Sequence, residues 1–186
     1  MKAKLLTGIA AAALAFGAGA AMADEDAELV INGEIEIVTK TAAPAHLDGA
    51  LGDKVISGWH YRTNETQALE LDDFDNPGMI FVDQALDQFE VVEGAAGKSC
   101  ASCHEDIESF AGLTAEMPKV NEAGELVVME DLVNTCRTER MEAEPWKWSG
   151  AEMQGMIAAI AHQSRGMPMN VAIDGPAQEY WEQGKE

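Results

Sequence analysis

Two cysteines and a histidine with fixed spacing lie in the middle of the chain. Cys100 and Cys103 are separated by two residues, and His104 follows directly. This C-x-x-C-H pattern is typical of covalent haem c attachment, in which both cysteines form thioethers and the histidine binds iron. The pattern therefore predicts one haem c, with Cys100 and Cys103 as the haem-binding residues and His104 as an iron ligand.

Two other uses of the same residues explain the sequence less well. A redox disulfide between Cys100 and Cys103 would leave His104 without a role, and the preceding residues do not resemble the strand that such motifs follow. Four candidate ligands for a zinc ion are present, namely these three residues and Cys136. However, the adjacent Cys103 and His104 would rarely chelate one tetrahedral ion. Haem attachment is the interpretation that uses every residue of the motif.

The first 23 residues are typical of a secretory signal peptide. Lys2 and Lys4 precede the apolar run 5–20, and Ala21-Met22-Ala23 is a small-x-small cleavage site. The apolar run is short for a membrane span and no second one follows, so no membrane insertion is expected after cleavage. The sequence thus predicts an exported protein. Exported proteins usually pair their structural cysteines in disulfides, so the odd number of three cysteines requires an explanation.

The chain is strongly acidic. Its formal charge is −21, and residues 1–23 contribute two lysines and no acidic residue, so the mature chain would carry −23. Such a surface repels nucleic acid and anionic lipid, which are therefore not expected as partners. The charge would attract basic patches on another protein, although solubility alone would also explain it. Five scattered cations are candidates for pairing with haem propionates: Lys98, Arg137, Arg140, Lys147 and Arg165.

A helix is predicted immediately before the motif. Residues 79–93 place Val82, Leu86 and Phe89 on one helical face, and Gly94 closes the segment. A second helix is predicted well after the motif, with Ser149 and Glu152 as a capping box. Its apolar residues at helical spacing are Met153, Met156, Ile157, Ile160 and Ala161.

Helices on both sides of the motif predict a mainly α, cytochrome c-like haem domain at residues 79–177. Residues 24–78 are predicted to form an irregular or extended N-terminal extension that packs on this domain. Within the extension, residues 29–38 alternate weakly and suggest an edge strand or a docking arm.

The third cysteine shares a helical face with apolar residues. Met129, Leu132, Val133, Cys136 and Arg140 recur at i, i+3, i+4, i+7 and i+11. Cys136 is therefore expected to point toward the core that holds the haem, where it could be a packed thiol or a thiolate ligand of the iron. Arg137 and Arg140 would favour the anionic form. Methionine is the ordinary competitor as distal ligand, and the chain has ten.

Four segments together resemble the SoxA family, the c-type cytochrome subunits of the SoxAX complex in periplasmic thiosulfate oxidation. The likeness runs from about Leu29 to the C-terminus, and is carried by LDDFDNPGMIFVD (71–83), CASCH (100–104), NTCRTERM (134–141) and IAHQSRGMPMNVAIDGPA (160–177). The resemblance implies that Cys136 is the distal thiolate ligand of the haem. It also implies a periplasmic location and a heterodimer with the small cytochrome SoxX. The family's complex acts as L-cysteine S-thiosulfotransferase on the SoxYZ carrier protein, and a small c-type cytochrome is the expected electron acceptor.

The sequence departs from the family pattern in one respect. SoxA proteins of this kind resemble two cytochrome domains in tandem, and the second domain carries another C-x-x-C-H and the catalytic haem. Residues 1–186 contain one such motif, so residues 178–186 are expected to begin a linker to a second domain that is absent. This chain would then supply an electron-transfer or structural haem domain with no catalytic residue of its own. The alternative is a non-catalytic monohaem electron carrier that acts alone.

Overall fold

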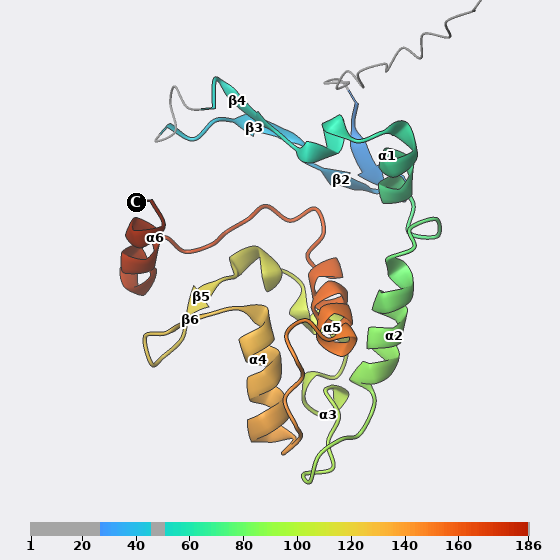
Figure 1. Cartoon of the computed structure of the whole chain (residues 1–186), viewed down its shortest axis with the longest axis vertical. Helices are drawn as coiled ribbons and strands as arrows, with labels where there is room; N and C mark the ends of the chain where they lie inside the picture. The colour runs from blue at the N-terminus through green and yellow to red at the C-terminus, as the bar shows by residue number, and fades with distance from the viewer. Residues whose placement is uncertain (1–26, 46–50, 186) are drawn as a thin grey trace, which may run out of the picture.

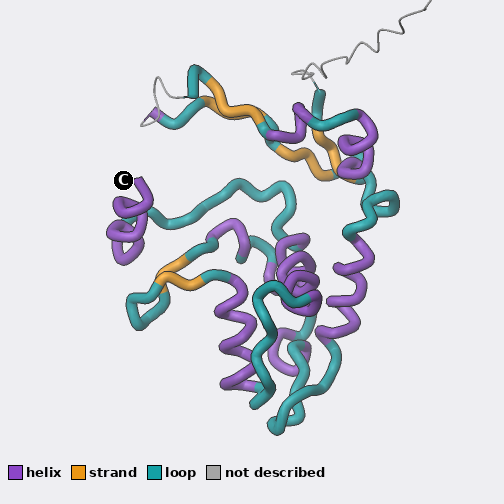
Figure 2. Tube along the Cα trace, in the orientation of Figure 1, coloured by secondary structure: helices purple, strands orange, loops and turns teal. Residues whose placement is uncertain are grey.

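The computed structural model describes residues 27–45 and 51–185, so the predicted signal peptide lies outside the described residues. Figure 1 shows two parts of the chain: a group of helices around α3, α4 and α5, and an N-terminal group of short strands with α1. The described residues are mainly helical with few, short strands (Figure 2), in agreement with the predicted fold class. Within them, no helix has the length and apolar character needed to cross a membrane.

The N-terminal part is built from two small antiparallel hairpins. Strand β1 (Leu29–Ile31) pairs with β2 (Ile35–Ile37), and β3 (Lys40–Ala42) pairs with β4 (Lys54–Ile56). The region predicted as one edge strand is thus a hairpin, because Asn32 and Gly33 adopt positive φ angles of 54° and 71° and reverse the chain.

A short helical stretch connects these hairpins to the main helices. The 3-10 helix η2 (Gly58–Tyr61) is followed by α1 (Asn64–Leu71), and the Thr63 side chain caps α1 by accepting a hydrogen bond from the Thr66 amide. The indole of Trp59 packs with Leu29 and Ile31 in a small cluster that is separate from the main core.

The main core forms where α2 (Met79–Phe89) packs against α5 (Ala151–His162). Gly155 permits this close approach, since a Cβ there would lie 3.1 Å from the Phe81 carbonyl oxygen. The buried cluster comprises Val82, Ala85, Phe89, Ile107, Met117, Val127, Met129, Met156, Ala159 and Ile160.

Two details of the predicted helices are wrong. Leu86 is 37% exposed, and Ala85 takes the buried position on α2 because the contact with α5 follows the face of Val82, Ala85 and Phe89. The capping box of the second helix does not form. Gly150 is the N-cap, and its extended backbone begins α5 without a side-chain hydrogen bond.

The segment between α2 and α5 carries the remaining elements. These are α3 (Ala101–His104), η3 (Ile107–Phe110), η4 (Thr114–Glu116), the hairpin of β5 (Lys119–Val120) and β6 (Leu126–Val127), α4 (Met129–Thr135) and the π-helical turn η5 (Cys136–Arg140). After α5 the chain runs through η6 (Gly175–Ala177) to α6 (Gln178–Lys185).

Asp73 connects the N-terminal part to the end of α5. Its carboxylate accepts hydrogen bonds from both terminal nitrogens of Arg165, at 2.6 and 2.7 Å, and a third from the side-chain Nδ2 of Asn32 at 2.9 Å. Nε2 of His162 lies 3.5 Å from the same carboxylate. The hydrogen bond from Arg165 is the largest influence on Asp73 and holds the pKa of this carboxyl well below its ordinary value of 3.8.

This cluster predicts an acid-sensitive contribution to stability. Because the pKa of Asp73 is lowered on folding, the contribution is complete above about pH 4 and is lost as the pH falls below that value. Asp73→Asn should therefore lower the unfolding free energy at pH 7 by about 1 to 3 kcal/mol, and the difference from wild type should shrink in acid. Denaturant titrations between pH 7 and pH 2 would measure both effects.

The matched control is Asp75→Asn, which removes an exposed carboxylate from the same loop. It should change stability little at any pH. Equal losses in the two variants would show that the Asp73 cluster makes no specific contribution.

Candidate haem site

One helical turn presents the C-x-x-C-H residues to a common side. The amides of Cys103 and His104 both donate to the Cys100 carbonyl at 3.1 Å, which closes the turn that becomes α3. Residues three and four apart lie on one face of a helix, so all three reactive side chains point together. The turn begins with reciprocal hydrogen bonds between Ser99 and Ser102, and Ser99 is buried.

The ring of His104 packs against an aromatic side chain. Its ring centroid lies 4.7 Å from that of Phe110, and Phe110 in turn makes an edge contact with Phe89 at 6.3 Å. Phe89 belongs to the buried core on α2. The histidine is thus connected to the packed interior through ring contacts, which limit its rotation.

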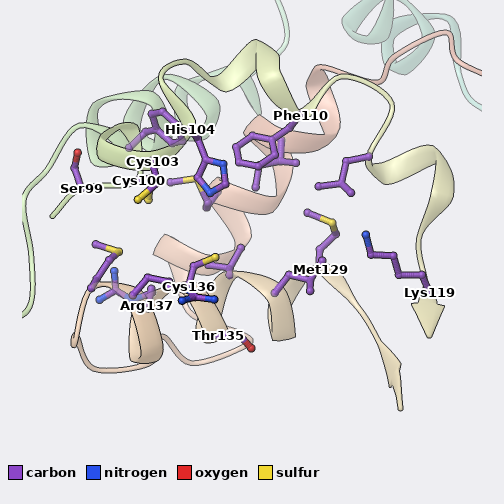
Figure 3. A pocket seen from close by; sticks show the side chains of 18 residues that line it. Ser99, Cys100, Cys103, His104, Phe110, Lys119, Met129, Thr135, Cys136 and Arg137 are labelled. Atoms are coloured by element: carbon purple, nitrogen blue, oxygen red, sulfur yellow. The ribbon is translucent and has the colours of Figure 1, made fainter. Parts of the chain in front are cut away.

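Cys136 reaches the same space from the opposite wall. It ends α4 and begins the π-helical turn η5, so it continues the face formed by Met129, Leu132 and Val133. Figure 3 shows His104 above and Cys136 below, with both side chains directed into the cavity between α3 and α4. The structure therefore brings together all four predicted site residues, although they are up to 36 residues apart in sequence.

The cavity between these walls suits a haem. Its volume is about 340 Å³, within the range of roughly 300 to 1,000 Å³ that is usual for cofactor sites. Apart from the cysteines and histidine its walls are mostly apolar: Phe89, Phe110, Leu113, Met129, Leu132, Val133, Met141, Met156 and Ile160. Two thiols for attachment, an imidazole and a facing thiol in an apolar cavity are the donor set of a c-type haem site.

A side-chain metal cluster is a different kind of site. Within residues 27–45 and 51–185, no group of three or more histidine, cysteine or acidic side chains is placed to hold a metal ion. A haem needs few ligands from the protein because its porphyrin already holds the iron, and His104 and Cys136 could bind that iron.

At Cys100 and Cys136, burial outweighs the effect of nearby positive charges on the thiol. Partial burial raises the pKa of Cys136, and the Arg140 guanidinium opposes this effect. Burial also raises the pKa of Cys100, and there Arg137 is the opposing charge. Of the two arginines that were expected to favour a Cys136 thiolate, Arg140 acts in that direction but does not outweigh burial. The effect of Arg137 falls on Cys100 instead.

The cavity also decides among the predicted cations and distal ligands. Of the five cations, Arg137 and Arg140 line it. Lys119, which was not among the predicted cations, lines it as well. Lys119 lies in β5, where no local pattern links it to the motif. Of the methionines in residues 27–45 and 51–185, those that line the cavity are Met129, Met141 and Met156. His162 lies elsewhere, beside Asp73.

Comparisons with known proteins show which family this chain resembles. A family model described as SoxA/TsdA, cytochrome c domain, matches residues 84–169, which include all four site residues. The L-cysteine S-thiosulfotransferase subunit SoxA of Paracoccus pantotrophus is 54% identical over 96% of this chain. The chain belongs to the SoxA family. The SoxA subunit of Rhodovulum sulfidophilum is 50% identical to this chain, and the match covers 98% of this chain. A cytochrome c domain implies haem c as the cofactor.

A solved structure of a related protein has a similar fold. The crystal structure of SoxXA from P. pantotrophus superposes with a TM-score of 0.80 at 52% identity, covering 86% of this chain and 62% of that chain. The SoxA-family chain spans 63% and 66% of the lengths of the two curated relatives.

Proposed function

We propose that this chain provides the first haem domain of a SoxA subunit in a periplasmic SoxAX complex. The complex would bond the outer sulfur of thiosulfate to a cysteine sulfur of the SoxYZ carrier protein, with release of one proton and two electrons. Two molecules of a small c-type cytochrome would each accept one of the electrons. The relatives are named as SoxA subunits of L-cysteine S-thiosulfotransferase, and the solved neighbour is a SoxXA structure, which supports SoxX as the heterodimer partner.

One observation carries the part of this proposal that concerns the chain itself. Cys100, Cys103 and His104 on α3 face Cys136 on η5 across a single apolar cavity. Cys100 and Cys103 would hold the haem covalently, and His104 and Cys136 would bind its iron. When bound, the haem supplies one-electron redox chemistry. The apolar walls would exclude water from it, and Lys119 and Arg140 are placed to pair with its carboxylates.

We assign no catalytic residue to this chain. Sulfur transfer would take place at a second haem, in the part of the relatives that this chain does not cover. The domain described here would then be an electron-transfer or structural unit. The stand-alone electron carrier is not favoured by the comparisons, which all name the SoxA subunit.

Haem attachment tests the proposal directly. Exported from cells that attach haem c, the chain should carry one covalent haem, measured by intact mass and by the pyridine haemochrome spectrum. Cys100→Ala with Cys103→Ala should abolish covalent haem completely, because both thioethers are lost. Cys136→Ala is the control and should keep covalent haem, since this residue forms no thioether. Coexpression with SoxX should yield a complex that elutes as a heterodimer.

A different result would contradict the attachment. An exported chain without haem, in which Cys100 and Cys103 form a disulfide under conditions that load other c-type cytochromes, would rule it out. If the chain carries haem but SoxX does not coelute with it, the assignment to SoxAX is contradicted, whereas the haem site is not.

A further inference from the structure

We propose that Arg137 is a positioning residue for Cys136: it joins the turn that carries Cys136 to the segment that leads into the C-x-x-C-H motif, and so holds the thiol opposite His104. This inference rests on the proposed function, in which Cys136 is an axial ligand. Arg137 directly follows Cys136, but its guanidinium is directed to Glu93 and Trp146.

Arg137 is buried, with 5% of its surface exposed, and its contacts fix the guanidinium in one geometry. Nη1 donates to the Glu93 carboxylate at 2.5 Å, and Nε donates to the Glu144 carbonyl at 3.0 Å. The guanidinium carbon also lies 4.0 Å from the ring centre of Trp146. A planar guanidinium can satisfy all three contacts at once, and an ammonium cannot.

These contacts connect two distant segments. Glu93 and Arg137 are 44 residues apart, and Glu93 lies seven residues before Cys100. Backbone hydrogen bonds extend the same junction: the amides of Ala95 and Ala96 donate to the carbonyls of Glu142 and Met141, each at 3.1 Å. We call residues 93–96 and 137–144, with these bonds, the brace.

The brace begins at the residue next to Cys136. The Ala143 amide donates to the Arg137 carbonyl at 2.9 Å, and the Met141 amide donates to the Cys136 carbonyl at 3.1 Å across the π-helical turn. π-helical turns are rare and are frequently found at functional sites, so we expect neighbouring contacts to help maintain this one. Arg137 supplies the side-chain contacts of this turn with the motif segment. Loss of Arg137 should therefore free the Cys136 end of α4 to move away from the cavity.

The test uses the haem-loaded chain and the spin-resonance and optical signals of ferric haem with a thiolate ligand. In Arg137→Met we expect the fraction of haem with this signal to fall at least twofold, with a matching rise in other ferric species. Arg137→Lys should retain an intermediate fraction, because it can keep the charge but cannot donate to both Glu93 and Glu144. Arg62→Met, at an exposed arginine in the N-terminal part, is the matched control and should keep the wild-type signal.

A double variant separates positioning from charge balance. Glu93→Gln with Arg137→Met removes the carboxylate that Arg137 pairs with, yet the brace is still broken, so the thiolate signal should stay reduced. If the double variant recovers the wild-type signal, Arg137 only neutralises Glu93 and the proposal is overturned. If Arg137→Met does not accumulate with haem, Arg137→Lys decides, and a wild-type thiolate fraction in it would overturn the proposal.

Failure of the inference can be told apart from failure of the proposed function. If Cys136→Met leaves the wild-type spectrum unchanged, Cys136 is not a ligand and the proposed site is wrong. If Cys136→Met removes the thiolate signal and both Arg137 variants keep it in full, the ligand assignment holds and the positioning role of Arg137 does not.

Discussion

Cys136→Met is expected to abolish the thiolate-type ferric spectrum and to raise the haem reduction potential. Axial ligands set haem potentials over a range of about 0.8 V, and we expect a shift on the order of 0.2 V or more upward. A thiolate stabilises the ferric state by donating electron density, and a thioether does so much less. Redox titration with optical and spin-resonance detection would measure both changes.

The result would also define the role of this domain. A haem with His104 and a Cys136 thiolate should be six-coordinate, low-spin and hard to reduce, which favours a structural or auxiliary role over turnover. If Cys136→Met leaves the spectrum and potential unchanged, Cys136 is a packed thiol. The cavity then restricts the next candidates to Met129, Met141 and Met156.

Gly94→Ala is expected to lower the unfolding free energy by about 2 to 5 kcal/mol, through left-handed backbone strain and a backbone overlap. Gly94 has a φ of 72°, and a Cβ there would overlap the Met141 carbonyl oxygen and lie 2.8 Å from the Ala143 nitrogen. These neighbours are backbone atoms of the brace and cannot rotate away. Denaturant unfolding of the haem-loaded chain would measure the loss.

Gly97→Ala is the matched control for Gly94→Ala. Gly97 lies in the same loop with a φ of 60°, but a Cβ there would have nothing within 4 Å. It should cost only about 1 to 2 kcal/mol, from the backbone conformation alone. The difference between the two variants measures the steric contact between the motif segment and residues 141–143. Equal losses would show that this contact is looser than the structure indicates.

The sequence predicted the parts of this protein that depend on short spacings. Cys100, Cys103 and His104 lie within one helical turn, so their residue types and separation were sufficient to indicate haem attachment. The face that ends at Cys136 was equally readable, because residues at i, i+3 and i+4 share a side whatever the rest of the chain does. On α2 the predicted face was shifted: Leu86 was expected to be buried, but Ala85 is buried instead. The contact with α5 determines which side of this helix is buried.

The tertiary structure alone decided what lies across the cavity. Nothing local relates Cys136 to His104, Lys119 to the motif, or Arg137 to Glu93. These pairs meet because α2 and α5 pack through Gly155, and because the segment after η5 pairs with the backbone after Gly94. Local patterns report only which face of an element is apolar, whereas the meeting of two faces depends on long-range packing and backbone pairing. The motif therefore predicted haem attachment, and the fold determined which side chains face the cavity.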